Sequence, residues 1–256
     1  MLDVHAPHEP IHSWKSFCMH IAAIVVGLLI AVGLEQTVEF FHHRHQREQL
    51  VESLRRDGQA NRNYIKDDIG VAQGVLDWAL VQAAAAERAG ATGPLIVQHT
   101  PKGTIGSPDA GVWPSAKASG VTNLLPPSAQ NWLEYLAEEY SETFESSSSA
   151  SAQLTLAFAA LDQVVMGHAR DTPSGDVDLS ALSATQRLSV VDHLRAIAER
   201  ARGVLRKLLI YDAGNEYILS MPLDQLDTLE AETAYAKIMG EKRAAYPAAQ
   251  FIVGGF

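Results

Sequence analysis

IAAIVVGLLIAVGL, residues 21–34, contains no polar side chain, and the preceding FCMH at residues 17–20 lengthens the apolar stretch with a single histidine. A helix needs about 20 mostly apolar residues to cross a bilayer. Trp14 precedes the stretch, Phe40 and Phe41 follow it, and aromatic rings of this kind favour the two membrane interfaces. The pattern predicts a single transmembrane helix over residues 14–34.

Two other interpretations of the stretch are less favoured. Ala31-Val32-Gly33 resembles the small-x-small site of a cleaved signal peptide, but the apolar pattern continues past Gly33 and the preceding tail is long and rich in histidine. A buried helix of a soluble domain is the second interpretation, and the length of the stretch without any polar face argues against it.

Within the predicted span, Ala23, Gly27 and Ala31 recur every four residues and lie on one helix face. Small residues in this pattern let a second helix approach closely, so they predict a homodimer contact in the membrane. Four arginines at positions 44, 47, 55 and 56 follow the span, against Lys15 before it. By the positive-inside rule this distribution favours a cytoplasmic main domain.

Composition narrows the class of protein. The 256 residues carry 20 Lys+Arg and 30 Asp+Glu, a formal charge of −10, which argues against a nucleic-acid partner. A single cysteine excludes an intramolecular disulfide or a cysteine-rich metal site. The chain has no G-x-S-x-G, phosphate-binding glycine loop or H-E-x-x-H motif, so we expect no cofactor and lean against an enzyme.

Downstream of the span the apolar residues follow helical spacing. Leu50, Leu54, Ile65 and Ile69 begin a stripe that Gly90 and Pro94 end, and the Ser183-x-x-Gln186 capping box starts a later helix whose stripe we follow to about Leu209. The SSSSAS run at residues 146–151 fits either a linker or a continuous helix. The predicted fold is all-α: one transmembrane helix continues into a long helix, and an up-and-down bundle follows.

We divide the chain by these patterns. The predicted parts are a tail (1–13), the transmembrane helix and its juncture (14–41), a long juxtamembrane helix (42–89), a loop region with a short helix near residues 113–118 (90–127), the rest of the bundle (128–246) and a C-terminal tail (247–256).

Two places are candidate sites. Glu39-x-x-His42 places two metal-ligand types on one helix face, but the second such motif that a di-iron bundle needs is missing. The alternative is a cluster of partly protonated histidines at the membrane interface. Trp113 and Pro114 lie in the loop region, where we expect an exposed tryptophan and an interaction loop.

Residues 25–65, VVGLLIAVGLEQTVEFFHHRHQREQLVESLRRDGQANRNYI, and residues 115–140 resemble an uncharacterised bacterial family of single-pass membrane proteins. The resemblance implies a short inner tail, one crossing of the inner membrane and a helical domain outside the cytoplasm, and it brings no catalytic residues. We therefore expect a membrane-anchored scaffold or sensor that contacts the bilayer and an unknown protein partner. The alternative is a membrane-tethered domain that binds metal or ligand through the Glu39 and His42 cluster or the loop at 95–125.

Overall fold

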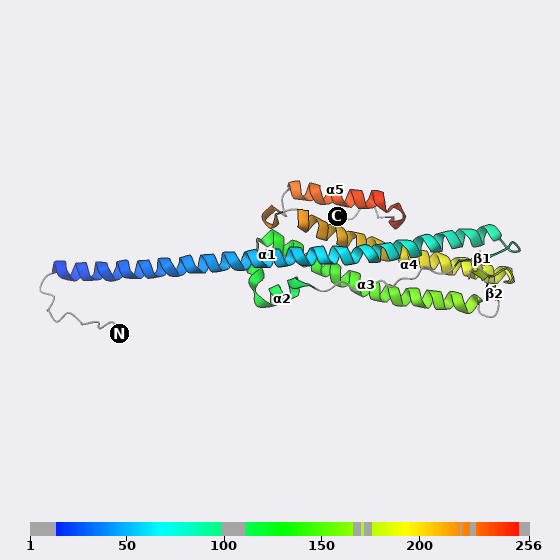
Figure 1. The fold of residues 1–256 in the computed structure, drawn as a ribbon, viewed down its shortest axis with the longest axis horizontal. Coiled ribbons are helices and arrows are strands. Elements are labelled where there is room, and N and C mark those ends of the chain that lie inside the picture. The colour runs from blue at the N-terminus through cyan, green and yellow to red at the C-terminus, as the bar shows by residue number, and fades with distance from the viewer. Residues whose placement is uncertain are drawn as a thin grey trace. The chain divides into compact units, whose positions relative to one another are not determined.

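The computed structural model describes residues 14–98, 111–165, 170–171, 176–220, 222–225 and 229–250, and nearly all of them are helical (Figure 1). The chain divides into two compact units, Met1–Gln49 and Leu50–Phe256. The fold is all-α, and a long N-terminal helix continues into a helical bundle, as the sequence predicts. The elements are α1 (Trp14–Ala89), β1 (Ile96–Val97), α2 (Val112–Ser119), η1 (Val121–Leu124), α3 (Pro127–Val165), β2 (Arg170–Asp171), β3 (Val177–Asp178), α4 (Ala184–Ser220), η2 (Leu223–Gln225), α5 (Leu229–Ala245) and η3 (Pro247–Ala249).

In the second unit, α4 is the central helix of the bundle. Ion pairs join Arg62 to Asp212 and Glu87 to Arg195, so the bundle part of α1 runs antiparallel to α4. Figure 1 shows α3 and α5 antiparallel to α4 as well, in the up-and-down order that the sequence predicts for successive helices. Since α1 and α3 both run opposite to α4, they are parallel to each other.

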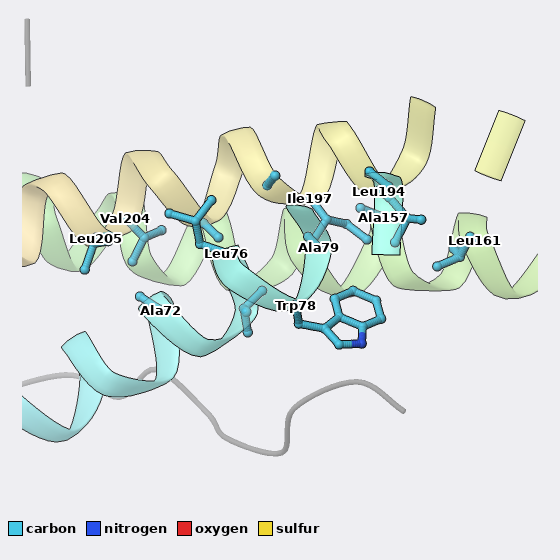
Figure 2. Close-up of a cluster of buried hydrophobic side chains, with 14 of the residues drawn as sticks. Ala72, Leu76, Trp78, Ala79, Ala157, Leu161, Leu194, Ile197, Val204 and Leu205 are labelled. Atoms are coloured by element: carbon cyan, nitrogen blue, oxygen red, sulfur yellow. The ribbon is translucent and has the colours of Figure 1, made fainter. Parts of the chain in front are cut away.

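Two apolar clusters fill the bundle. In the first, α1, α3 and α4 contribute side chains such as Leu76, Leu161 and Ile197, and Figure 2 shows these helices around the cluster. The second lies nearer the start of the bundle, where α2 joins α1, α3 and α4. Burial of apolar surface of this kind supplies most of the driving force for folding. The C-terminal half of α4 is buried on nearly every side, because neighbouring helices surround it.

One buried arginine fixes the far end of the bundle. Arg187, 4% exposed, donates hydrogen bonds to the carbonyl oxygens of Leu182, Ser180, Gly90 and Gly93. A guanidinium offers five donors in a fixed plane, so a single side chain can satisfy several loop carbonyls at once. It thereby ties the segment after α1 to the start of α4. The small antiparallel sheet β1-β3-β2 lies in the same connections.

Two helix ends lie where local sequence patterns predict them: the end of α1 and the start of α4. Gly90 has φ of +58° directly after α1, and Ser183 and Gln186 form the predicted capping box, with Ser183 N donating to Gln186 Oε1 over 2.9 Å. Helix α3 runs through the serine-rich segment, so the continuous-helix alternative is the correct one. The predicted end of α4 near Leu209 is too early, because the helix continues to Ser220 through charged residues that other helices pair.

Candidate functional site

The first unit contains an apolar helical surface. Its hydrophobic side chains are exposed all round the helix, and α1 includes a window long and apolar enough to cross a membrane, of which 0% is buried. Soluble proteins rarely expose apolar surface of this extent. The large exposed side chains between positions 21 and 34 are Ile21, Ile24, Val25, Val26, Leu28, Leu29, Ile30, Val32 and Leu34.

Polar side chains at the two ends of this surface bond to their own helix. The Thr37 hydroxyl donates to the carbonyl oxygen of Gly33 over 2.7 Å, and His20 Nδ1 lies 2.9 Å from the carbonyl oxygen of Ser16. Such bonds to the preceding turn satisfy a polar group without help from water. The arrangement therefore lowers the cost of placing these residues near an apolar phase.

The predicted metal ligands occupy exposed positions on α1. Glu39 Oε1 lies 4.0 Å from Nε2 of His43, one turn further on, and the ring of His42 lies 6.4 Å from that of His43. In the part of the chain that the structure describes, no group of three or more His, Cys, Asp or Glu side chains is placed to hold a metal ion. The fold thus adds no further ligand to the Glu39 and His42 pair there.

The predicted contact face of Ala23, Gly27 and Ala31 lies on the exposed surface of α1. A Cβ atom added at Gly27 would meet no other heavy atom within 4 Å. The face is therefore open within this chain, and a homodimer contact there stays a prediction.

Trp113 is buried, so the prediction of an exposed tryptophan is wrong. It is 8% exposed, packs in the second apolar cluster, and its indole Nε1 donates to Glu134 Oε2 over 3.1 Å. Lys117 forms an ion pair with the same carboxylate, and the hydrogen bond from Lys117 is the main reason that the pKa of Glu134 is lowered. A tryptophan on a short amphipathic helix is drawn into the core when a partner for its N–H is available. Pro114, the other residue of this prediction, is exposed.

The bundle contains a charged cluster that the sequence patterns did not predict. Arg62 on α1 donates through Nε to Asp212 Oδ1 over 3.0 Å and through Nη2 to Glu216 Oε2 over 2.6 Å. Lys242 on α5 pairs with both carboxylates, so two cations meet two anions between three helices. Burial lowers the pKa of Lys242, but hydrogen bonds to Asp212 and Glu216 outweigh it and raise the pKa overall. Asp212 lies within LLIYDAGNEYI, a largely apolar run at residues 208–218, and this position is the signal that could have indicated a buried ion pair.

Aromatic side chains pack beside this cluster. The ring of Trp132 lies 4.8 Å from that of Tyr217 and 5.1 Å from that of Tyr235. Burial raises the pKa of Tyr235 and of Tyr135, so both phenols remain neutral at physiological pH. Burial also raises the pKa of Glu139, and the nearby Glu142 carboxylate adds to this effect.

A small cavity, mostly apolar, lies between α1, α2, α3 and α4. It measures about 60 Å³, and Asp57, Asn61 and Asn215 line it with apolar neighbours. Asp57 Oδ2 accepts a hydrogen bond from the backbone N–H of Val112 over 3.0 Å, which fixes the start of α2. The volume admits a few water molecules and is well below the roughly 300–1,000 Å³ of small-molecule sites.

Comparison of the chain with protein-family models, curated proteins and solved structures finds no match. The function must therefore be argued from these residues themselves. The buried carboxylate of Asp212 is paired with Arg62 and Lys242, which suits a structural core, whereas the N-terminal part of α1 presents a continuous apolar surface.

Proposed function

We propose that this chain is a single-pass membrane protein whose helical bundle acts through protein contacts. The observation that carries the proposal is the apolar surface of α1, which is exposed all round the helix and has the length of a membrane span. In water this surface would be strongly unfavourable, whereas a bilayer offers it an environment of matching polarity.

The resemblance to the uncharacterised single-pass family supports a place in a bacterial inner membrane, with the bundle outside the cytoplasm. The arginines at 44, 47, 55 and 56 favour the opposite orientation, but long domains cross largely regardless of such charges. We give the resemblance more weight for this reason.

A role in protein contacts fits the interior of the bundle better than catalysis does. The buried carboxylate of Asp212 and the partly buried carboxylate of Glu216 are held in ion pairs with Arg62 and Lys242. The raised pKa values of Tyr135 and Tyr235 keep both phenols protonated and weakly nucleophilic. Groups engaged in this way stabilise a fold and are poorly placed to transfer protons to a substrate.

Membrane insertion is tested by fractionation of cells that express the full chain. We expect the wild type to remain with membranes after an alkaline carbonate wash and to be released by detergent. The Val25→Arg/Leu29→Arg variant should move to the soluble fraction, because each arginine costs about 2.5–3.5 kcal/mol at the centre of a membrane helix. The Ala60→Arg/Ala84→Arg variant carries the same charge at exposed bundle positions and is the matched control.

Release of the wild type by carbonate would refute the anchor. An intact mass that shows loss of the first 33 residues would instead establish the signal-peptide interpretation. Orientation is read separately, from a reporter fused after Phe256 that is active only outside the cytoplasm. Its activity would support the family resemblance, and activity of the corresponding cytoplasmic reporter would show that the arginines decide the orientation.

A further inference from the structure

The cavity between α1, α2, α3 and α4 is apolar over most of its wall and polar where α1 faces α4. Its polar lining consists of Asp57 and Asn61, one turn apart on α1, and of Asn215 on α4. A Cβ atom added at Gly58 would lie 3.6 Å from Asn215 Oδ1, so the glycine lets this amide come close to α1. Three side chains that carry oxygen therefore gather beside an apolar hollow.

Each of these three residues keeps a hydrogen-bond acceptor that no described residue uses. Asn61 is 8% exposed, and within the described ranges its side chain has no hydrogen bond. Asn215 donates through Nδ2 to the carbonyl oxygen of Tyr211 over 2.9 Å, which leaves its Oδ1 as an acceptor. Asp57 accepts a bond from the backbone N–H of Val112 at Oδ2, and it has no ion pair with a described residue. Buried polar groups are nearly always bonded, so these acceptors call for a ligand with donors.

The acceptors and the apolar wall together match a primary ammonium group on an alkyl chain. An ammonium group brings three N–H donors and a positive charge, which suit three acceptors and an unpaired carboxylate. A Ca²⁺ ion would need about six to eight oxygen ligands, and most of this wall is apolar. The same apolar wall suits the methylene groups behind an ammonium.

The volume of the cavity sets how much of the ligand enters. A buried water needs about 10–15 Å³, so the volume of about 60 Å³ holds roughly four groups of that size. An ammonium and three methylene groups, the end of a lysine side chain, fill this space. The formal charge of −10 on the chain also favours a basic partner.

We propose that the cavity binds a lysine side chain of a partner protein. The lysine Nζ donates to Asp57 Oδ1, Asn61 Oδ1 and Asn215 Oδ1, and its methylene groups lie against the apolar wall. The proposal gives a chemistry to the protein contact proposed above and rests on that role. Its test uses the full chain in detergent micelles and does not depend on insertion into a membrane.

The probe is n-propylammonium chloride, which carries the ammonium and three carbon atoms. The chain is labelled with 5-fluorotryptophan, and Trp113→Phe assigns the fluorine NMR signal of Trp113, which lines the cavity. We expect this signal to shift with a dissociation constant in the millimolar range, since so small a ligand gains little binding free energy. Propan-1-ol, which has the same size without the charge, should bind at least about tenfold more weakly.

Two variants each change one acceptor of the cavity. Asp57→Asn keeps an oxygen for the N–H of Val112 but removes the charge, and Asn61→Leu removes an amide at similar size. Each should weaken n-propylammonium binding about tenfold. Asp67→Asn, at an exposed position of α1, removes the same charge and should leave the affinity unchanged. Circular dichroism should show an unaltered helical signal, and Asn61→Leu should unfold at no lower temperature than the wild type, because it removes a buried amide without a partner.

Two peptides distinguish a protein partner from a free amine. A short peptide with one lysine among glycine and alanine residues should bind at least as tightly as n-propylammonium. Its Nε-acetyl form lacks the charge and should bind at least about tenfold more weakly. Binding of n-propylammonium without binding of the lysine peptide would overturn the protein partner and assign the cavity to a small free amine.

Three further results would overturn the proposal. Equal shifts of the Trp113 signal with sodium or calcium chloride at the same ionic strength would assign the cavity to a metal ion. The absence of a saturable shift would show that the cavity holds water alone. An affinity that neither Asp57→Asn nor Asn61→Leu lowers would place the ammonium elsewhere. None of these results bears on the membrane anchor, which the carbonate wash tests separately.

Discussion

Replacement of Asp212 by Asn should destabilise the bundle strongly, although it changes one atom. The Asp212 side chain is 3% exposed and pairs with both Arg62 and Lys242. Asn keeps the shape of the side chain but removes the charge, so two cations would then share Glu216 alone.

The magnitude follows from burial. Breaking a buried ion pair by loss of one partner costs about 3–5 kcal/mol. Arg62 is 19% and Lys242 16% exposed, so water partly solvates the remaining cations, and we expect about 2–3 kcal/mol. For a unit of roughly 200 residues this corresponds to a fall in Tm of roughly 5–10 °C.

The assay is thermal unfolding of the full chain in detergent micelles, followed by circular dichroism. Glu52→Gln is the matched control, because it breaks an ion pair with Arg56 whose side chains are 73% and 75% exposed. Such a surface pair within one helix contributes about 0.3–0.5 kcal/mol. The double variant Asp212→Asn/Lys242→Met removes the excess cation and should recover part of the loss. Equal effects of Asp212→Asn and Glu52→Gln would refute the reasoning.

Two further predictions use matched pairs within one helix. Gly214→Ala should lower the free energy of unfolding by about 1–3 kcal/mol, because the added Cβ would collide with Cδ2 of Leu136. Gly203→Ala, where an added Cβ meets no heavy atom within 4 Å, should raise the free energy of unfolding by about 0.5–1 kcal/mol. Chemical denaturation compares the two variants, and effects of the same sign would contradict the packing around Gly214. Glu139 has a pKa raised above its unfolded value, so its contribution to stability falls as pH rises from about 4.5 through the raised pKa. Glu139→Gln should therefore have a higher Tm than the wild type at pH 8 and an equal Tm at pH 4. The control variant Glu138→Gln, at an exposed position, should have the Tm of the wild type at both pH values. A difference in Tm at Glu139 that does not depend on pH would show that the charge is not the cause.

Local sequence was enough to predict the fold class. The apolar stretch at 21–34, the leucine spacing after it and the capping box at Ser183 each act within a few turns of one helix, so periodicity and capping predicted them without any knowledge of packing. Gly90 likewise ends α1 through its own backbone conformation.

The contacts between residues far apart in the sequence could be identified only from the tertiary structure. Arg62 and Asp212 are 150 residues apart, and an isolated sequence gives no measure of whether such charges meet. The same holds for Arg187, which donates hydrogen bonds to carbonyl oxygens of two separate loops. It also holds for Trp113, whose buried indole N–H donates to Glu134 on another helix. The sequence alone thus determined that the chain is helical and which stretch is apolar all round. Packing decided which polar residues are buried, because burial depends on partners that only the folded chain brings together.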